Sequence, residues 1–229
     1  MKRIPILVLA ALLILVSAAG CSKKQTATTV PAEQSAPAAT ETKKDAGTPE
    51  VPLTDIMKQT QSIKGAYYEM KTSVATGQGT VTSTSKNWIT GNKVRVETES
   101  MGLKTVTIVT ADGFIYLYNP ANKTATRIGS IDSEAANQWA FKDPAKYKVL
   151  GREKISEQQC VIISNIDIPD ENKMWISEAI GMPLKMEATV AGGKATSEFS
   201  NIKLGPQDEG LFTLPAGTTI IETPRLPGH

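Results

Sequence analysis

The sequence predicts a mainly β protein with some α-helix (α+β), in which an antiparallel meander forms the sheet. About ten short segments are rich in β-branched or aromatic residues, and several of them alternate apolar and polar side chains. Turn-forming pairs such as Gly91-Asn92, Asp112-Gly113 and Gly192-Gly193 separate these segments. Only two segments favour a helix. Short strands joined by tight turns pair as hairpins, which gives the antiparallel order.

Residues 1–20 have the pattern of a secretory signal peptide. Lys2 and Arg3 precede an apolar run over residues 4–16, and small residues follow it. The run is shorter than the roughly 20 residues that cross a bilayer. The small residues before Cys21 resemble the lipobox of bacterial lipoproteins, in which the cysteine is lipidated and becomes the new N-terminus. An ordinary signal peptide with a chance cysteine is the alternative.

This resemblance implies an extracytoplasmic protein that its lipidated Cys21, carrying chains such as palmitate, anchors to the bacterial cell membrane. Removal of Lys2 and Arg3 leaves 23 basic and 23 acidic residues. A neutral chain has no electrostatic attraction for nucleic acid, so we expect no nucleic-acid partner. The membrane partner is therefore expected to be held by lipid and not by charge.

Residues 21–50 are expected to form a disordered tether behind the lipid. They are rich in Thr, Ala, Lys, Glu, Gln and Pro and almost lack large apolar residues. Such a segment cannot bury enough apolar surface to offset the entropy of ordering it. As a flexible coil it would reach on the order of 30 Å from the membrane. The folded domain is expected over residues 51–223, followed by a disordered tail at 224–229.

The folded domain is expected to open with a helix. Thr54 is a candidate N-cap, and Asp55 suits the first turn. Ile56, Met57 and Ile63 can share an apolar side. Gly65 is placed to end the helix.

The strand candidates fall on both sides of a second predicted helix at residues 132–141. Ser130 or Asp132 can cap this helix, and Asp143-Pro144 ends it. It is expected to lie across one face of a curved sheet. The strand candidates are residues 67–74, 93–97, 105–110, 114–118, 123–128, 147–154, 159–168, 173–176, 184–190 and 196–204.

Three parts of the chain resemble the periplasmic lipoprotein carriers of the LolA and LolB type. The first contains Asp112-Gly113 and then Tyr116-Leu117-Tyr118-Asn119-Pro120. The second contains Met174-Trp175-Ile176-Ser177 and Gly181-Met182-Pro183-Leu184-Lys185. The third is Leu211-Phe212-Thr213-Leu214-Pro215. The resemblance covers about residues 53–222 and, in its charged strand at 93–97, is nearer to lipoprotein-sorting relatives of Gram-positive bacteria.

The resemblance implies a strongly curved antiparallel half-barrel of about 10–11 strands with helices over the concave face. Between sheet and helices such proteins hold an apolar cavity that takes acyl chains, which is a usual form of small-molecule site. The expected function is therefore a carrier or sensor of an acyl chain, from a lipid or a lipoprotein, or of another hydrophobic ligand. The alternative is a regulatory or interaction module with a filled cavity and an envelope protein as its partner.

Large aromatic residues are the candidates for the cavity and its lid. Each of them can equally belong to a core, because any packing of helices on a sheet needs such residues. The candidates are Trp88, Phe114, Tyr116, Tyr118, Trp139, Phe141 and Trp175.

No catalytic, cofactor or metal site is expected. The single histidine is the last residue, His229, so no Ser-His-Asp or Cys-His arrangement is predicted. No Cys/His set with zinc spacing is present. Cys160 lies in an apolar segment and is expected to be a buried small hydrophobe. We therefore expect a binding protein and not an enzyme.

Overall fold

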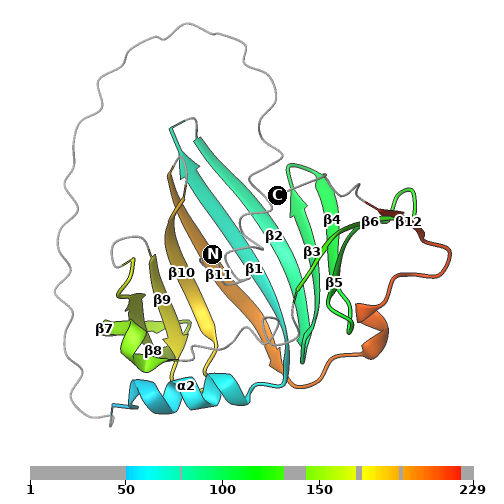
Figure 1. The fold of residues 1–229 in the computed structure, drawn as a ribbon. Coiled ribbons are helices and arrows are strands. Elements are labelled where there is room, and N and C mark those ends of the chain that lie inside the picture. Colours follow the sequence, from blue (N-terminus) through cyan, green and yellow to red (C-terminus); the bar gives the residue numbers. More distant parts are fainter. Residues whose placement is uncertain (1–49, 78, 132–142, 169–171, 191–192, 223–229) are drawn as a thin grey trace, which may run out of the picture.

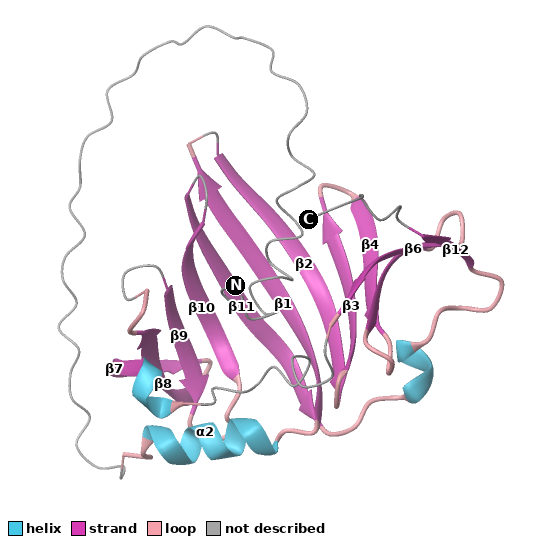
Figure 2. Cartoon of the chain, viewed as in Figure 1, coloured by secondary structure: helices cyan, strands magenta, loops and turns pink. Residues whose placement is uncertain are grey.

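The computed structural model describes residues 50–222, except 78, 132–142, 169–171 and 191–192. Twelve strands form one curved, unclosed sheet (Figures 1 and 2). The mainly β fold class is thus confirmed. The strands are β1 (Gly65–Thr76), β2 (Gly79–Thr90), β3 (Lys93–Ser100), β4 (Leu103–Val109), β5 (Phe114–Asn119), β6 (Thr124–Ser130), β7 (Tyr147–Ile155), β8 (Gln158–Asn165), β9 (Asn172–Ser177), β10 (Pro183–Val190), β11 (Gly193–Leu204) and β12 (Thr219–Glu222).

The sheet consists of two meanders joined through the middle. Its order is β12-β6-β5-β4-β3-β2-β1-β11-β10-β9-β8-β7. Within each meander consecutive strands pair antiparallel, as the tight turns predicted. The two meanders meet where β1 pairs with β11, far away in sequence. β12 is the exception to the antiparallel prediction, because it pairs parallel with β6.

Two strands were absent from the predicted set. β2 is rich in Ser and Thr and has few large apolar residues, so its apolar alternation is weak. β12 is a short edge strand in which all four residues are exposed. In its sequence, Thr-Ile-Ile-Glu, the two isoleucines are adjacent and exposed. Apolar and polar residues therefore do not alternate, and the strand could not be identified by alternation.

The first helix, α2 (Leu53–Ser62), begins one residue before the predicted cap. The prediction of Thr54 as N-cap was wrong. Pro52 takes that position in an extended conformation, and its carbonyl oxygen accepts hydrogen bonds from the amides of Asp55 and Ile56 at 3.0 and 3.2 Å. Proline suits a helix start because its fixed φ is compatible and its missing N–H is not needed there.

Gly65 does not end α2 as predicted. The C-cap is Ile63, in an extended conformation, and Gly65 is the first residue of β1. Its φ is not among the positive ones, so the left-handed role of a helix-ending glycine does not apply. The backbone oxygens of Gly205 and Ile89 come too close to Gly65 to leave room for a Cβ, which explains the glycine instead.

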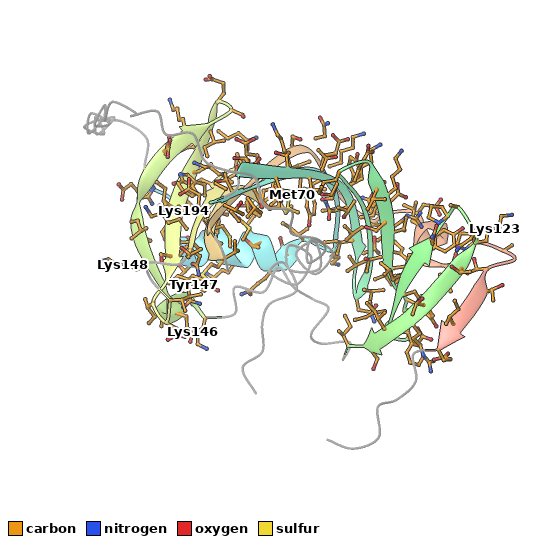
Figure 3. The ribbon with its side chains drawn as sticks, turned by 90° about the horizontal axis from the view of Figure 1, so that it is seen from above. Met70, Lys123, Lys146, Tyr147, Lys148 and Lys194 are labelled. Atoms are coloured by element: carbon orange, nitrogen blue, oxygen red, sulfur yellow. The ribbon has the colours of Figure 1, made fainter. Side chains whose placement is uncertain are left out.

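α2 packs on one face of the sheet, which we call the inner face; the opposite face is the outer face. Ile56 and Met57 of α2 contact Val161, Ile163 and Ile176 of β8 and β9. Seen from above, α2 and Met70 lie on the concave side of the curved sheet, where Tyr147 also points (Figure 3). The second predicted helix, residues 132–141, lies outside the described residues.

The predicted signal peptide and all of the tether except Glu50 also lie outside the described residues. In the part of the chain that the structure describes, no helix is long and apolar enough to cross a membrane.

Candidate functional site

The register of the central strands arranges the inner face in rows. Directly opposed residues of an antiparallel pair point to the same face, and faces alternate along a strand. The row nearest the start of β1, which follows α2, is entirely apolar. It consists of Ala66, Ile89, Val94 and Val109.

The rows become more polar along β1, away from α2. The second row mixes apolar and polar groups: Tyr68, Asn87, Val96 and Thr107. The third combines Met70 with three hydroxyl residues, Ser85, Thr98 and Thr105. The fourth joins four hydroxyl residues, Ser197, Thr72, Ser83 and Ser100, to Leu103 of β4. A fifth row beyond it is apolar again and consists of Ala195, Val74 and Val81.

No inner-face position in these rows carries a charged residue. Every Asp, Glu, Lys and Arg of β1–β4 points to the outer face. These residues are Glu69, Lys71, Lys86, Lys93, Arg95, Glu97, Glu99 and Lys104. The inner face is therefore electrically neutral along four adjacent strands, and a hydroxyl-rich band crosses it between two apolar rows.

The charges of the outer face pair with one another. Tyr67 Oη donates to Glu69 at 2.6 Å, and Arg95 lies 2.7 Å from Glu97. Burial, followed by the hydrogen bond and charge of Glu69 and the charge of Glu97, raises the pKa of Tyr67 to about 12. These contacts belong to the outer surface and leave the inner face without charge.

The five described aromatic candidates do not line the inner face. Trp88 is opposite Tyr67 on the outer face, with ring centroids 5.2 Å apart. Trp175 donates from Nε1 to Glu153 at 2.7 Å, and Lys185 Nζ lies 4.4 Å from its ring. Register explains the outcome, because Trp88 follows the inner-face residue Asn87 directly.

Phe114, Tyr116 and Tyr118 come together in one outer-face core. Tyr116 and Tyr118 pack with Val106, Ile108 and Ala125, and Phe114 is partly buried against them. They are therefore core residues of the outer side, which is the alternative that the sequence left open. Trp139 and Phe141 lie outside the described residues.

The C-terminal segment covers this outer-face core. The 3-10 helix η3 (Glu209–Phe212) buries Phe212, and Leu214 packs against the cluster. Arg95 donates to Leu211 O at 3.2 Å, and Lys93 forms an ion pair with Glu209. A pocket of about 450 Å³ lies between this segment and the strands, lined among others by Lys93, Tyr116 and Phe212.

The sequence analysis overlooked the polar inner-face residues Ser83, Ser85 and Asn87. All three are buried, although the segment lacks the large apolar residues that mark a core strand. The available signal was the β-branched content of residues 80–84, Thr-Val-Thr-Ser-Thr, which favours a strand. Within the described residues, no group of three or more acidic, His or Cys side chains could hold a metal ion.

Cys160 is fully buried and forms no disulfide within the described residues, and its burial confirms its predicted role as a small hydrophobe. Its thiol lies in a cluster with Trp175 and Leu184. Burial, reinforced by the charges of Glu178 and Glu153, raises its pKa to about 11, while a backbone hydrogen bond from Ile155 opposes the shift.

We expect Cys160 to resist alkylation in the folded protein. A thiol with a pKa near 11 holds a very small fraction of thiolate at pH 8, and only thiolate reacts. In the full chain carrying Cys21→Ser, which leaves this single cysteine, iodoacetamide should modify the protein in urea but scarcely without it. Mass spectrometry measures the difference. Fast modification without urea at pH 8 would contradict the buried placement.

No protein-family model matches the chain, and the search of curated proteins gives no match. Solved structures are similar in fold. Lipoprotein LppX of Mycobacterium tuberculosis is 12% identical, with a TM-score of 0.42 over 66% of this chain and 96% of its own. An outer membrane lipoprotein-sorting protein domain of Vibrio parahaemolyticus is 14% identical, with a TM-score of 0.33 over 69% and 93%.

MucB in the MucA/MucB complex of Pseudomonas aeruginosa is also similar, with 13% identity and a TM-score of 0.42. The match covers 74% of this chain and 62% of that chain, so this chain spans less than two thirds of it. The first two neighbours are a lipoprotein and a lipoprotein-sorting protein domain. At these identities the likeness is one of fold.

Proposed function

We propose that this protein is an extracytoplasmic binding protein that holds an acyl chain or another hydrophobic ligand on the inner face of its sheet. The observation that carries the proposal is the neutrality of this face over β1–β4, combined with its apolar row at the start of β1, the strand that follows α2. An acyl chain needs apolar area and no charge, since an unpaired charge in such a contact is costly to desolvate.

The proposal includes membrane anchoring through a lipid on Cys21 and a non-catalytic role. A tethered binding domain can accept a ligand beside its own membrane without chemistry of its own. The helices that the family resemblance implies over the concave face belong to the same proposal. α2 packs against β8 and β9, and the helix predicted at residues 132–141 would cover part of the face of β1–β4.

The test introduces a charge on each face of the sheet. Thr107→Glu places a carboxylate on the inner face, in the row of Val96. Thr84→Glu places one on the outer face, opposite Lys71, and serves as the matched control. We expect Thr107→Glu to reduce binding of a fluorescent fatty-acid probe by at least about tenfold, whereas Thr84→Glu retains it.

The measurement uses the full chain carrying Cys21→Ser, with circular dichroism to check that both variants fold. Native mass spectrometry of the same protein identifies any lipid that copurifies. Equal binding by the two variants would argue against the inner face as the site. Failure of the parent chain to bind any lipid would contradict the proposed carrier function.

Protein interaction is the second candidate function, and the edge strand β7 favours it. β7 ends the sheet order, so one side of its backbone faces no partner strand among the described residues. Val149 and Leu150 on this strand are 41% and 44% exposed. An exposed edge with apolar side chains can accept a strand of another protein. If the parent chain binds no lipid, the β7 edge becomes the leading candidate for the binding surface.

A further inference from the structure

The hydroxyl-rich band of the inner face indicates what kind of head group the ligand carries. In the fourth row, Thr72 lies opposite Ser83 on one side and Ser197 on the other. The hydroxyls of Thr72 and Ser197 are 2.9 Å apart and hydrogen-bonded. In the third row, Ser85 lies opposite Thr98. Neutral hydroxyl groups, and no ions, thus form a band across the face between the apolar row of Ala66 and the apolar row of Val74 and Val81.

Some of these buried polar groups have unused hydrogen-bonding capacity. The Ser83 side chain, 6% exposed, has no hydrogen-bond partner within the described residues. Asn87, 1% exposed, donates from Nδ2 to Ser85 Oγ at 2.9 Å and to Tyr68 O at 3.5 Å. Its Oδ1 accepts no hydrogen bond from any residue of the described part. Buried polar groups are normally hydrogen-bonded, so the Ser83 hydroxyl and Asn87 Oδ1 can each bind a polar atom of a ligand.

The placement of the charged residues determines which lipid head group can bind at this site. A carboxylate or phosphate head group would require a nearby cation, because its desolvation is costly without one. Lys71 and Lys86 are on the neighbouring strands but point to the outer face. An uncharged head group with ester and hydroxyl oxygens can use the Ser83 hydroxyl as a donor. Asn87 lies four residues further along β2, about 13 Å away at the usual rise of a strand, so its Oδ1 can meet only another part of the lipid. The acyl chain can then follow the rows of Met70, Tyr68 and Ala66 toward the start of β1.

We infer that the inner face takes an uncharged glycerolipid, a mono- or diacylglycerol, with its glycerol and ester oxygens in the hydroxyl-rich band at Ser83 and its acyl chain directed toward α2. This inference rests on the proposed function and specifies the ligand class for the same face. Toward α2 the acyl chain has three rows to lie on, those of Met70, Tyr68 and Ala66, whereas a single apolar row lies on the other side of Ser83. The absence of cations on the inner face of β1–β4 disfavours an ionised head group.

The test compares two ligands that share one acyl chain. Monooleoylglycerol and oleate, which is ionised at pH 8, compete with a fluorescent acyl probe for the full chain carrying Cys21→Ser. We expect monooleoylglycerol to bind roughly five- to tenfold more tightly than oleate, the effect of one or two hydrogen bonds to buried groups.

A matched pair of double variants assigns this preference to the inner face. Thr72→Val with Ser83→Ala removes two opposed inner-face hydroxyls, whereas Ser73→Ala with Thr82→Val removes the adjacent opposed pair on the outer face. The preference for monooleoylglycerol should disappear in the first variant and persist in the second. If the first variant does not fold, Ser83→Ala alone replaces it, because this change breaks no hydrogen bond of the described residues.

The outcomes separate the inference from the function on which it rests. Equal affinity of the parent chain for the two ligands, or equal behaviour of the two double variants, would overturn the neutral-lipid assignment and leave the acyl-binding function intact. No displacement of the probe by either ligand, together with no binding of the probe itself, would overturn both.

Discussion

Replacing Phe212 with alanine is expected to lower the free energy of unfolding by about 3–5 kcal/mol, the usual cost of removing a buried phenyl ring. Phe212 is 2% exposed, although it belongs to a short 3-10 helix outside the sheet. Its ring lies 5.6 Å from Lys93 Nζ, and the preceding residue, Leu211, accepts a hydrogen bond from Arg95. Loss of the ring removes the buried apolar group of this segment, which lies against β3.

Urea unfolding followed by circular dichroism measures the change. Phe212→Leu is the conservative comparison and should cost less, because leucine retains much of the apolar volume. Thr213→Ala, at the exposed next position, should have a small effect. A loss below about 1 kcal/mol for Phe212→Ala would mean that the segment contributes little to folding, contrary to the burial of its ring.

The local elements of this fold could be predicted from the sequence, whereas their long-range arrangement could not. The turn Asn119-Pro120 between β5 and β6 is encoded by adjacent residues, and so is the alternation of Tyr68 and Met70 in β1. The pairing of β1 with β11 joins segments more than a hundred residues apart, and no local signal specifies it. That pairing merges the two meanders into one sheet.

The functional face was harder to identify than the strands. Alternation separates the two faces of a strand but does not say which face is inner, so the bulky Trp88 and Tyr116 were natural candidates for a cavity. The register places both on the outer face, while the inner face receives Ser83, Ser85 and Asn87. Small polar residues give no hydrophobic signal, and their shared burial depends on the pairing of β2 with β1.

Gly65→Ala is expected to destabilise the protein by about 1–3 kcal/mol or more, the range typical of overpacking. Gly65 opens β1 between β2 and the end of β11. A Cβ at this position would lie 2.6 Å from Gly205 O and 2.9 Å from Ile89 O, both backbone atoms. The backbone is held there, because Gly205 N donates to Gly65 O at 2.9 Å. A methyl group would therefore clash with backbone atoms. The clash cannot be relieved by rotating a side chain, so the backbone itself would have to move.

Gly129→Ala in β6 is the matched control. A Cβ at Gly129 meets no atom within 4 Å, and its φ is not positive. There alanine should be neutral or slightly stabilising, since it reduces the freedom of the unfolded chain without a clash. Urea unfolding of both variants gives the comparison. Because β1 carries the junction of the two meanders, the clash at Gly65 should also weaken β1–β11 pairing, visible as faster amide exchange in Tyr68 and Met70. Equal stability of the two variants would show that the close approach at Gly65 is not maintained.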